Sequence, residues 1–266
     1  GERNLLVLND GTTRQIDPLK GDFDLSLMAL NNRRQVLAWS VGASHPSGRQ
    51  SMVWQNGQGT PLGMLPDSFS STALGLNDHG VAIGYNSKAP GEVNADQRAV
   101  LWERDTIMPL PLPSGAIGSR GRDINNRGQA VLSVYFEAGT CHSGSQRAAQ
   151  TFLWQQGSLK PLALLPIGPD DYSLSAHAAD INNVGQVVGA KGHRNCFAPA
   201  PILRATVWRG GAVYELEKLL VNERGEPVTT LRLQRALAIN DKGQILVEEF
   251  SHFVDNPKYF VLSPLE

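Results

Sequence analysis

The feature that most constrains the fold of this chain is a short asparagine-rich phrase that occurs five times along its 266 residues. In each copy an Asn is followed by Asn or Asp, and in four of the five copies a Gly stands two residues further on. The first residues of the five copies are Asn31, Asn77, Asn125, Asn182 and Asn240, at spacings of 46, 48, 57 and 58 residues. A tandem repeat of this length indicates an array of similar small units that bury their apolar faces against one another.

A second phrase, which ends in Trp, alternates with the first. It places Trp54, Trp102, Trp154 and Trp208 after short apolar runs and just before polar turns. β-branched and aromatic residues favour strands, and Asn-Asp-x-Gly between two apolar runs is typical of a hairpin turn. Each unit therefore holds four short strands, A to D, arranged as two hairpins. We expect the repeated Trp side chains to pack between units and the repeated Asn side chains to be structural.

A single four-stranded sheet cannot bury both of its faces, whereas copies arranged around an axis can. The predicted fold is an all-β, five-bladed β-propeller of four-stranded antiparallel blades, with residues 1–266 as one domain. Residues 236–263 are expected to form strands A, B and C of the last blade, and an N-terminal strand over residues 13–19 is expected to close that blade as strand D. Residues 4–8 then have no assigned place. A six-bladed ring or an open solenoid is the alternative.

The composition argues against several classes of function. The chain has 24 Lys and Arg against 25 Asp and Glu, a net charge of −1, which gives no reason to expect a nucleic-acid protein or a polybasic membrane binder. No apolar run approaches the roughly 18 residues that a transmembrane helix needs. Hydrophobic residues make up 41% of the chain, which is enough for a buried core.

The repeated phrases resemble those of the bacterial HAF-type extracellular repeat family. The best copy is Asp180–Gly189 together with Arg204–Trp208, and the resemblance runs from about residue 4 to residue 263. The His-Ala-Phe triplet of that family is replaced in every copy here, for example by Gln150-Thr151-Phe152, and Arg34 stands where Gly is usual. The resemblance implies an exported bacterial protein and no particular reaction.

The two cysteines point to the same compartment. Cys141 and Cys196 follow the third and fourth Asn phrases by 16 and 14 residues, so both fall in connections between strands B and C. Equivalent loops of adjacent blades lie side by side, and we therefore predict a disulfide between them. A disulfide favours a secreted or periplasmic location in the bacterial cell envelope, whereas two free thiols would favour the cytosol.

The topology separates a face with short turns from a face with long loops. The A–B and C–D turns share the first face, and the longer B–C and D–A connections share the second, where binding usually sits. The B–C loops hold eight basic and four acidic residues. The residues predicted to form a ligand-binding face there are His45, Arg49, Arg98, His142, Arg147, His193, Arg194 and His252. A slightly basic rim favours an anionic ligand, although polar loops carry such residues without any function.

Motifs for catalysis are weak. Asp123 and Asp180 occupy one repeat position near the propeller axis, where paired carboxylates would suit glycosidase-like acid–base chemistry. The same position is Ala29, Gly75 and Ala238 in the other units, which favours a structural role. The histidine spacings match no zinc signature, so neither a metal site nor a cofactor is predicted.

The sequence favours an exported, non-catalytic binding or interaction module that uses its B–C and D–A loops. The ligand classes considered are a glycan, a small anion and another protein of the cell envelope. The first alternative is a carbohydrate-active hydrolase or lyase that uses Asp123 and Asp180. The second is a purely structural repeat domain of a larger surface protein. The oligomeric state is open.

Overall fold

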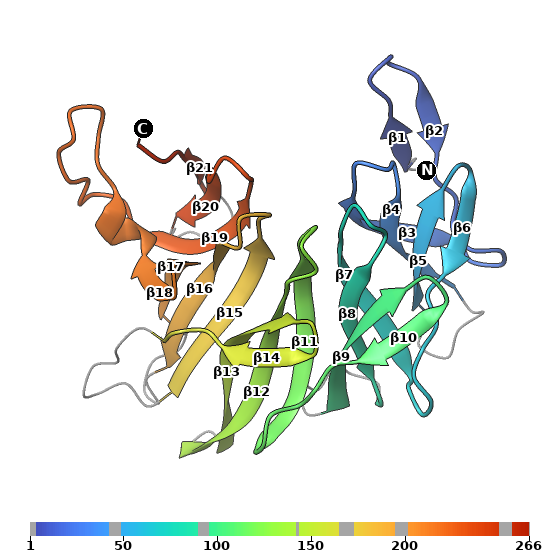
Figure 1. Ribbon diagram of the computed structural model, residues 1–266, viewed down its shortest axis with the longest axis horizontal. Coiled ribbons are helices and arrows are strands. Elements are labelled where there is room, and N and C mark those ends of the chain that lie inside the picture. Colours follow the sequence, from blue (N-terminus) through green and yellow to red (C-terminus); the bar gives the residue numbers. More distant parts are fainter. Residues whose placement is uncertain are drawn as a thin grey trace. The chain divides into compact units, whose positions relative to one another are not determined.

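The structure of the protein is a computed structural model that describes residues 4–42, 49–89, 96–141, 144–164, 173–194, 202–249 and 257–265. Its strands form five consecutive antiparallel blades, the arrangement of a five-bladed β-propeller, and confirm the predicted fold class (Figure 1). They group into two compact units, Gly1–Leu112 with Gly118–Asn126, and Pro113–Ile117 with Arg127–Glu266. None of the helices among the described residues is long and apolar enough to cross a bilayer.

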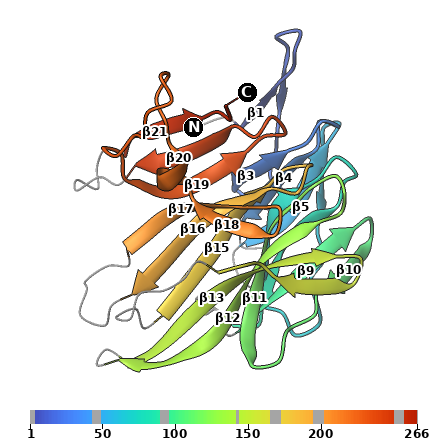
Figure 2. The same ribbon diagram turned by 60° about the vertical axis from the view of Figure 1, so that its left-hand side comes forward.

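Four blades have four strands in chain order (Figure 2). Blade 1 consists of β3 (Asp24–Leu30), β4 (Val36–Val41), β5 (Arg49–Gln55) and β6 (Gln58–Pro61). Blade 2 consists of β7 (Ser70–Leu76), β8 (Ala82–Ser87), β9 (Gln97–Glu103) and β10 (Thr106–Pro109). Blade 3 consists of β11 (Ala116–Ile124), β12 (Ala130–Cys141), β13 (Gly144–Gln155) and β14 (Ser158–Pro161). Blade 4 consists of β15 (Ser173–Ile181), β16 (Val187–Arg194), β17 (Ile202–Arg209) and β18 (Ala212–Glu215).

The two ends of the chain differ from the expected closure. A short 3₁₀ helix, η2 (Leu216–Leu219), leads towards blade 5, which consists of β19 (Leu233–Ile239), β20 (Ile245–Glu249) and β21 (Tyr259–Leu262). This blade has three strands in the described part of the chain, and the expected N-terminal fourth strand is not paired with it. Instead β2 (Thr13–Gln15) pairs with β1 (Leu5–Val7), the segment that had no predicted place. The sixth sheet is this hairpin, so a sixth four-stranded blade is not found.

The reason for the different pairing is the exposed first face of blade 1. Leu6 and Ile16 of the N-terminal segment are buried in one cluster with Val36, Met52 and Trp54. The N-terminal hairpin therefore covers apolar side chains on this face of blade 1. The hairpin thereby removes apolar surface from water, which is the main driving force for its docking.

Each blade has two apolar faces because successive strand residues point to opposite sides. In β4, Val36 and Ala38 face the N-terminal hairpin, whereas Leu37 packs towards blade 2 with Ala73 and Trp102. Blades 3 and 4 are joined by a corresponding cluster that contains Trp208, as the repeated Trp phrase predicted. The blade junctions described in this way carry the hydrophobic core.

The Asn phrases form the A–B turns, where the predicted turn chemistry is present. Gly80 closes the second turn with a φ of 83°, a conformation that glycine adopts without steric cost. Arg34, which replaces this glycine in the first copy, adopts a φ of 61° and therefore bears the strain of the left-handed region.

The first Asn of each phrase also links neighbouring blades. Asn31 Nδ2 donates to the carbonyl oxygen of Asn77 at 2.8 Å, and Asn77 Nδ2 donates to that of Asn125 at 3.1 Å. In the second of the two compact units, between blades 4 and 5, Asn182 Nδ2 donates to the carbonyl oxygen of Asn240 at 3.0 Å. Within its own turn, Asn77 Oδ1 accepts the amides of residues 79 and 81. We call this series of forward-directed bonds the asparagine ladder.

The second residue of the phrase adds a parallel link. Asp78 accepts the backbone amide of Asn32 at 2.8 Å and the Nδ2 of Asn126 at 2.6 Å, so its carboxylate bridges blades on both sides. These hydrogen bonds, led by the amide of Asn32, lower the pKa of Asp78 below its usual value. The charged form of Asp78 therefore contributes to the contact between blades.

We predict that Asn77→Asp destabilises the protein, because the change keeps the acceptor atom within the turn but replaces the donor that reaches the next blade. The matched control is Asn240→Asp, since Asn240 is exposed and its side chain donates to Gln244 of its own turn. Asn77→Asp should lower the free energy of unfolding by about 2 kcal/mol more than Asn240→Asp. Urea unfolding measures the difference, and equal effects would show that the ladder does not contribute to stability.

Candidate functional site

Of the eight residues predicted to form the ligand-binding face, the structure describes the side chain of one, Arg98. His45, His142 and His252 lie outside the described residues. Four further candidates lie in strands whose side chains at those positions are likewise outside the description: Arg49, Arg147, His193 and Arg194. Arg98 is described and half-buried on β9, where its Nε donates to the carbonyl oxygen of Leu110 at 2.7 Å. For the other candidates a role in binding stays a prediction.

The predicted disulfide also lies outside the described part of the chain. Cys196 falls in the segment 195–201, and the side chain of Cys141 is not described although its backbone ends β12. The pairing of the two cysteines stays a prediction.

The two aspartates considered for catalysis have structural surroundings. Asp180 Oδ1 accepts the amide of Ile181 at 2.7 Å, and its Oδ2 accepts the amide of Ile239 in blade 5 at 2.7 Å. Both oxygens of this carboxylate thus receive backbone donors, one of them from the next blade. Bonds of this kind hold a carboxylate in place and occupy the oxygens that a general acid or base would use.

Asp123 stands at the same repeat position in β11. A Cβ placed on Gly75 would lie 2.5 Å from Asp123 Oδ1 and 2.8 Å from its Cα. Gly75 is therefore the residue in blade 2 that leaves room for Asp123. The close fit indicates that this aspartate packs against the neighbouring blade.

A group of polar side chains gathers at the loop end of blade 2. β7 begins, β8 ends and β9 begins at this end, and Ser70, Ser87 and Gln97 lie opposite one another in register. Two residues further into the sheet, Thr72 and Tyr85 form the next row on the same face. We call these five residues, together with Arg120 of β11, the loop-end cluster.

Arg120 organises this cluster. Its Nε donates to Gln97 Oε1, and its guanidinium carbon lies 4.8 Å from the centroid of the Tyr85 ring. A cation over an aromatic face is favourable, particularly where water is partly excluded. Tyr85 is 4% exposed and Gln97 is 3% exposed, so the arginine lies against a largely dry surface.

Two polar atoms of the cluster lack a hydrogen-bond partner within the described residues. They are Gln97 Nε2 and Thr72 Oγ1, on side chains that are 3% and 1% exposed. An unsatisfied buried donor costs free energy comparable to a lost hydrogen bond, and such an atom in a folded protein calls for an explanation. The cluster contains a guanidinium, an amide, hydroxyls and no carboxylate. An acceptor from outside, such as an anion, matches this set of donors.

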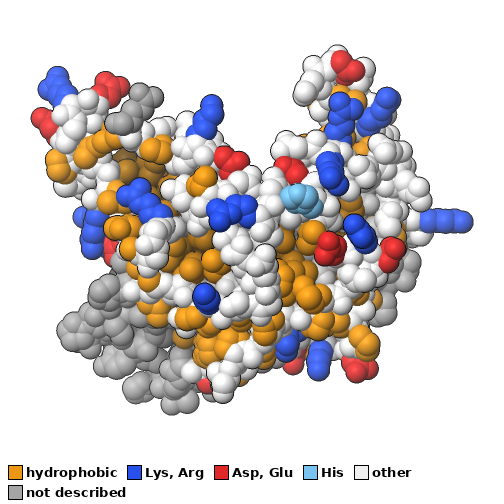
Figure 3. All heavy atoms as spheres, in the orientation of Figure 1, with side chains coloured by type: hydrophobic (Ala, Val, Ile, Leu, Met, Phe, Trp, Pro, Cys, Tyr) orange, Lys and Arg blue, Asp and Glu red, His pale blue; other side chains and the backbone are white. Residues whose placement is uncertain are grey.

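A charged ligand must be recognised locally on this protein. On the face shown in Figure 3, acidic and basic side chains are interspersed and do not form one extended field. Among the described side chains there is no group of three or more His, Cys, Asp and Glu that would hold a metal ion.

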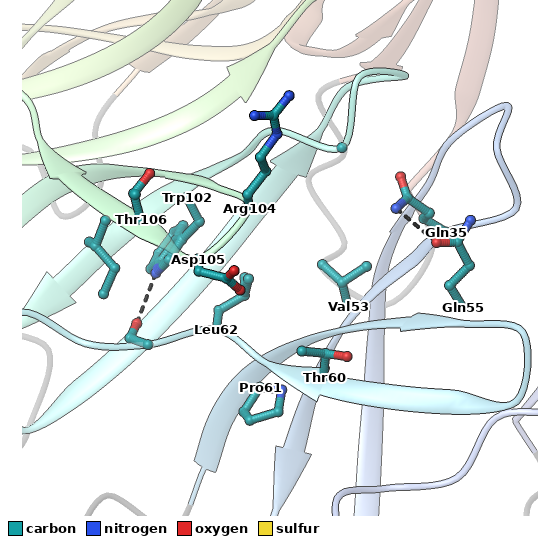
Figure 4. A pocket seen from close by; sticks show the side chains of 13 residues that line it. Gln35, Val53, Gln55, Thr60, Pro61, Leu62, Trp102, Arg104, Asp105 and Thr106 are labelled. Atoms are coloured by element: carbon teal, nitrogen blue, oxygen red, sulfur yellow. Dashed lines mark hydrogen bonds between the residues drawn. The ribbon is translucent and has the colours of Figure 1, made fainter.

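A pocket of about 410 Å³ lies on the side of the short turns, between blades 1 and 2 (Figure 4). Its apolar lining comes from Val53, Leu62, Trp102 and Ile107, and its polar lining includes Gln35, Gln55, Arg104 and Asp105. We call it the turn-side pocket. The sequence patterns favour binding on the other face and do not predict this pocket. One signal was present in the sequence: the C–D turn of blade 2 reads Arg-Asp, where that of blade 4 reads Gly-Gly.

No family model matches the chain, and no curated protein matches it. Among solved structures, the β-propeller domain of the trilobed protease from Pyrococcus furiosus matches with a TM-score of 0.43 and 12% identity over 82% of this chain and 56% of that chain. A PL25 ulvan lyase bound to its saccharide matches with a TM-score of 0.46 and 10% identity, over 88% and 65%. A streptogramin B lyase matches with a TM-score of 0.45 and 12% identity, over 99% and 77%. The chain thus spans less than two thirds of the first two proteins.

We predict that Asp180→Ala destabilises the protein by about 2 kcal/mol, because the amides of Ile181 and Ile239 lose their acceptor. Thermal and urea unfolding measure the change. Residues kept for catalysis commonly cost stability, so their removal tends to stabilise a protein. An increase in stability for Asp180→Ala would therefore restore the catalytic reading of this aspartate.

Proposed function

We propose that this chain is an exported, non-catalytic binding module that holds an anionic ligand at the loop end of its blades. The ligand class is a carboxylate-bearing glycan or a small carboxylate. The observation that carries the proposal is the loop-end cluster, in which Arg120 lies over Tyr85 and next to the unsatisfied amide nitrogen of Gln97.

The chemistry of the cluster supports an anion. A guanidinium presents several N–H donors in a plane and suits a carboxylate, and the Gln97 amide and Thr72 hydroxyl add neutral donors beside it. Because Arg120 is partly exposed while its neighbours are buried, a ligand can reach the charge without unfolding the blade. Low exposure around the site strengthens each bond to the ligand.

The position of the cluster supports the loop face as the working surface. Ser87 and Gln97 flank the B–C connection of blade 2, so the cluster lies at the end of the blade where the long loops were predicted to bind.

The two alternatives have less support. A hydrolase or lyase needs a carboxylate that is available for proton transfer, whereas both oxygens of Asp180 accept backbone amides. A purely structural repeat does not account for the guanidinium of Arg120 beside the buried Gln97 and Thr72 groups, which lack partners within the described residues.

Arg120→Gln should weaken binding of an acidic oligosaccharide, with oligogalacturonate as the probe, by about tenfold or more, because a charge-assisted bond is lost. Isothermal titration measures the affinity. Arg209→Gln is the control, since Arg209 also lies over a tyrosine, 5.2 Å from the Tyr214 ring, but outside the cluster. The carboxyl-reduced oligosaccharide should bind weakly to the unmodified protein.

A second variant separates binding from folding. Gln97→Glu preserves the size of the side chain and its acceptor for Arg120, removes the unsatisfied donor and adds a negative charge. It should abolish binding of the acidic probe while the unfolding temperature stays close to that of the unmodified protein. Unchanged affinity in both variants, or equal affinity for the carboxyl-reduced probe, would refute the anionic site.

Export is the second part of the proposal. It is supported by the resemblance to the HAF-type repeats and by the placement of both cysteines in B–C connections. The chain purified from the bacterial envelope should be two mass units lighter than its reduced form, because disulfide formation removes two hydrogens. Mass analysis without reductant should also yield a peptide that joins Cys141 to Cys196. Two free thiols in that preparation would contradict the predicted bond.

A further inference from the structure

The turn-side pocket is built on a frame that the protein uses twice. In blades 1 and 2, Trp102 Nε1 donates to the carbonyl oxygen of Gly63 at 2.8 Å. In blades 3 and 4, Trp208 Nε1 donates to the carbonyl oxygen of Ala163 at the same distance. Each tryptophan is thus a structural part of its junction. Their burial agrees with this, since Trp102 is 2% exposed and Trp208 is 4% exposed.

The glutamines of the pocket also belong to the frame. Gln35 Nε2 donates to Gln55 Oε1 at 3.2 Å, and the equivalent pair Gln129 and Gln155 makes the same bond at 3.2 Å. The apolar positions correspond too. The outer strand of each junction packs one partly buried aliphatic residue against the tryptophan cluster, Ile107 of β10 in the first and Val213 of β18 in the second. These shared features stabilise the blades and do not by themselves indicate a ligand.

The polar rim is where the two junctions differ. The C–D turn that lines the pocket reads Arg104-Asp105-Thr106, whereas its equivalent in blade 4 is Gly210-Gly211-Ala212. The pocket therefore has a guanidinium and a carboxylate that the frame does not need, together with a Thr106 hydroxyl that donates to the carbonyl oxygen of Glu103 at 2.8 Å.

The apolar floor of the pocket also differs from the equivalent place between blades 3 and 4. A Cβ on Gly63 would lie 2.9 Å from Cδ1 of Ile107, so the glycine gives room to the longer side chain. The other junction pairs Ala163 with the shorter Val213. The glycine thus accommodates the larger apolar side chain on the floor of the pocket.

Arg104 occupies its position at a conformational cost. Its φ is 54°, in the left-handed region that Gly and Asn tolerate best, and Gly210 stands at the corresponding place with a φ of 59°. In blade 1 the same place is Asn56, also with a φ of 54°. Gln156 holds this place in blade 3 with a φ of 49°, so the strained backbone recurs, and the charge of the exposed Arg104 side chain is what distinguishes the turn that lines the pocket.

We propose that the turn-side pocket is a second binding site, which takes one neutral hexose unit of a glycan. Asp105 accepts hydroxyl donors, Arg104 donates to hydroxyl oxygens, and the amides of Gln35 and Gln55 offer both kinds of group beside them. Figure 4 shows these two glutamines with Val53 on one side of the pocket and Trp102 with Asp105 on the other. The apolar C–H face of a pyranose ring suits the surface formed by Val53 and its aliphatic neighbours.

The pocket favours a neutral ring over other ligands. Arg104 and Asp105 are adjacent and of opposite charge, so the rim carries no net charge and an anion would meet the carboxylate. The volume of about 410 Å³ lies at the small end of the range for small-molecule sites. A peptide added as an extra strand would need a long free edge, but the outer strands β6 and β10 are four residues long and end at Pro61 and Pro109.

The test transfers the turn of blade 4 into blade 2. In the variant Arg104→Gly, Asp105→Gly, Thr106→Ala, the affinity for a neutral methyl hexoside should fall by about tenfold or more, because hydrogen bonds to charged groups are lost. The probes are methyl glucoside, methyl galactoside and methyl mannoside, each titrated separately. The readout is the NMR signal of the Trp102 indole N–H, identified with Trp102→Phe, together with isothermal titration. The change relieves the strain at Arg104 but removes the hydrogen bond from the Thr106 hydroxyl to the carbonyl oxygen of Glu103, so the unfolding temperature should stay close to that of the unmodified protein.

A control variant makes the same kind of backbone change elsewhere. Gln156 lies in the C–D turn of blade 3 with a φ of 49°, and Gln156→Gly should leave hexoside affinity unchanged. The proposal is wrong if none of the three hexosides shifts the Trp102 signal, or if the blade 4 turn leaves their affinity intact. Tighter binding of methyl glucuronide, or of an unstructured peptide, at the same signal would also overturn it.

The two sites are separable by experiment. Arg120→Gln should leave hexoside binding at the turn-side pocket unchanged, and the turn variant should leave oligogalacturonate binding unchanged. The hexose proposal can therefore fail while the anionic site stands, and the reverse also holds.

Discussion

The asparagine ladder is the interaction on which the described structure depends most. Each four-stranded blade exposes two apolar faces, and these faces are buried only when the next blade stands at a fixed height and angle. The bond from Asn31 to the carbonyl oxygen of Asn77 sets this relation, because a side-chain amide held by its own turn reaches the main chain of the next turn. The bridge through Asp78 repeats the relation one residue along. Hydrophobic burial supplies the free energy of association, and the ladder supplies its geometry.

Function is expected where individual blades depart from this common frame. The frame assigns structural partners to the repeated Asn and Trp side chains, and it also uses Asp180, whose oxygens accept amides. The Arg104–Thr106 turn does not recur in equivalent form in the other blades, whereas the repeat position of Arg120 is also an arginine, Arg235, in blade 5. The turn brings a charged pair to a place where the repeat needs none. Comparing one blade with another within the chain therefore separates groups needed for folding from groups available for recognition.

Much of the fold could be predicted from the sequence because the repeat is local. The Asn-x-x-Gly turns and the Trp phrases each specify a short element through turn chemistry and strand propensity, and these elements are all present. The N-terminal strand was expected in blade 5 because the two ends of the chain fit ring closure, and its pairing with β1 was not predicted. The burial of Leu6 and Ile16 against blade 1 decides the matter, and this tertiary packing leaves no local signal. The sites were harder to predict, since both depend on which side chains from different blades come together.

The direction of the asparagine ladder has a consequence for how such a protein can grow. Every described rung donates from one unit to the main chain of the unit that follows, and the final member, Asn240, is exposed and donates within its own turn. A newly duplicated segment added at that end would find a donor already in position and would need to bring only a carbonyl group. For this contact, lengthening of the array by gene duplication would therefore require no substitution at Asn240.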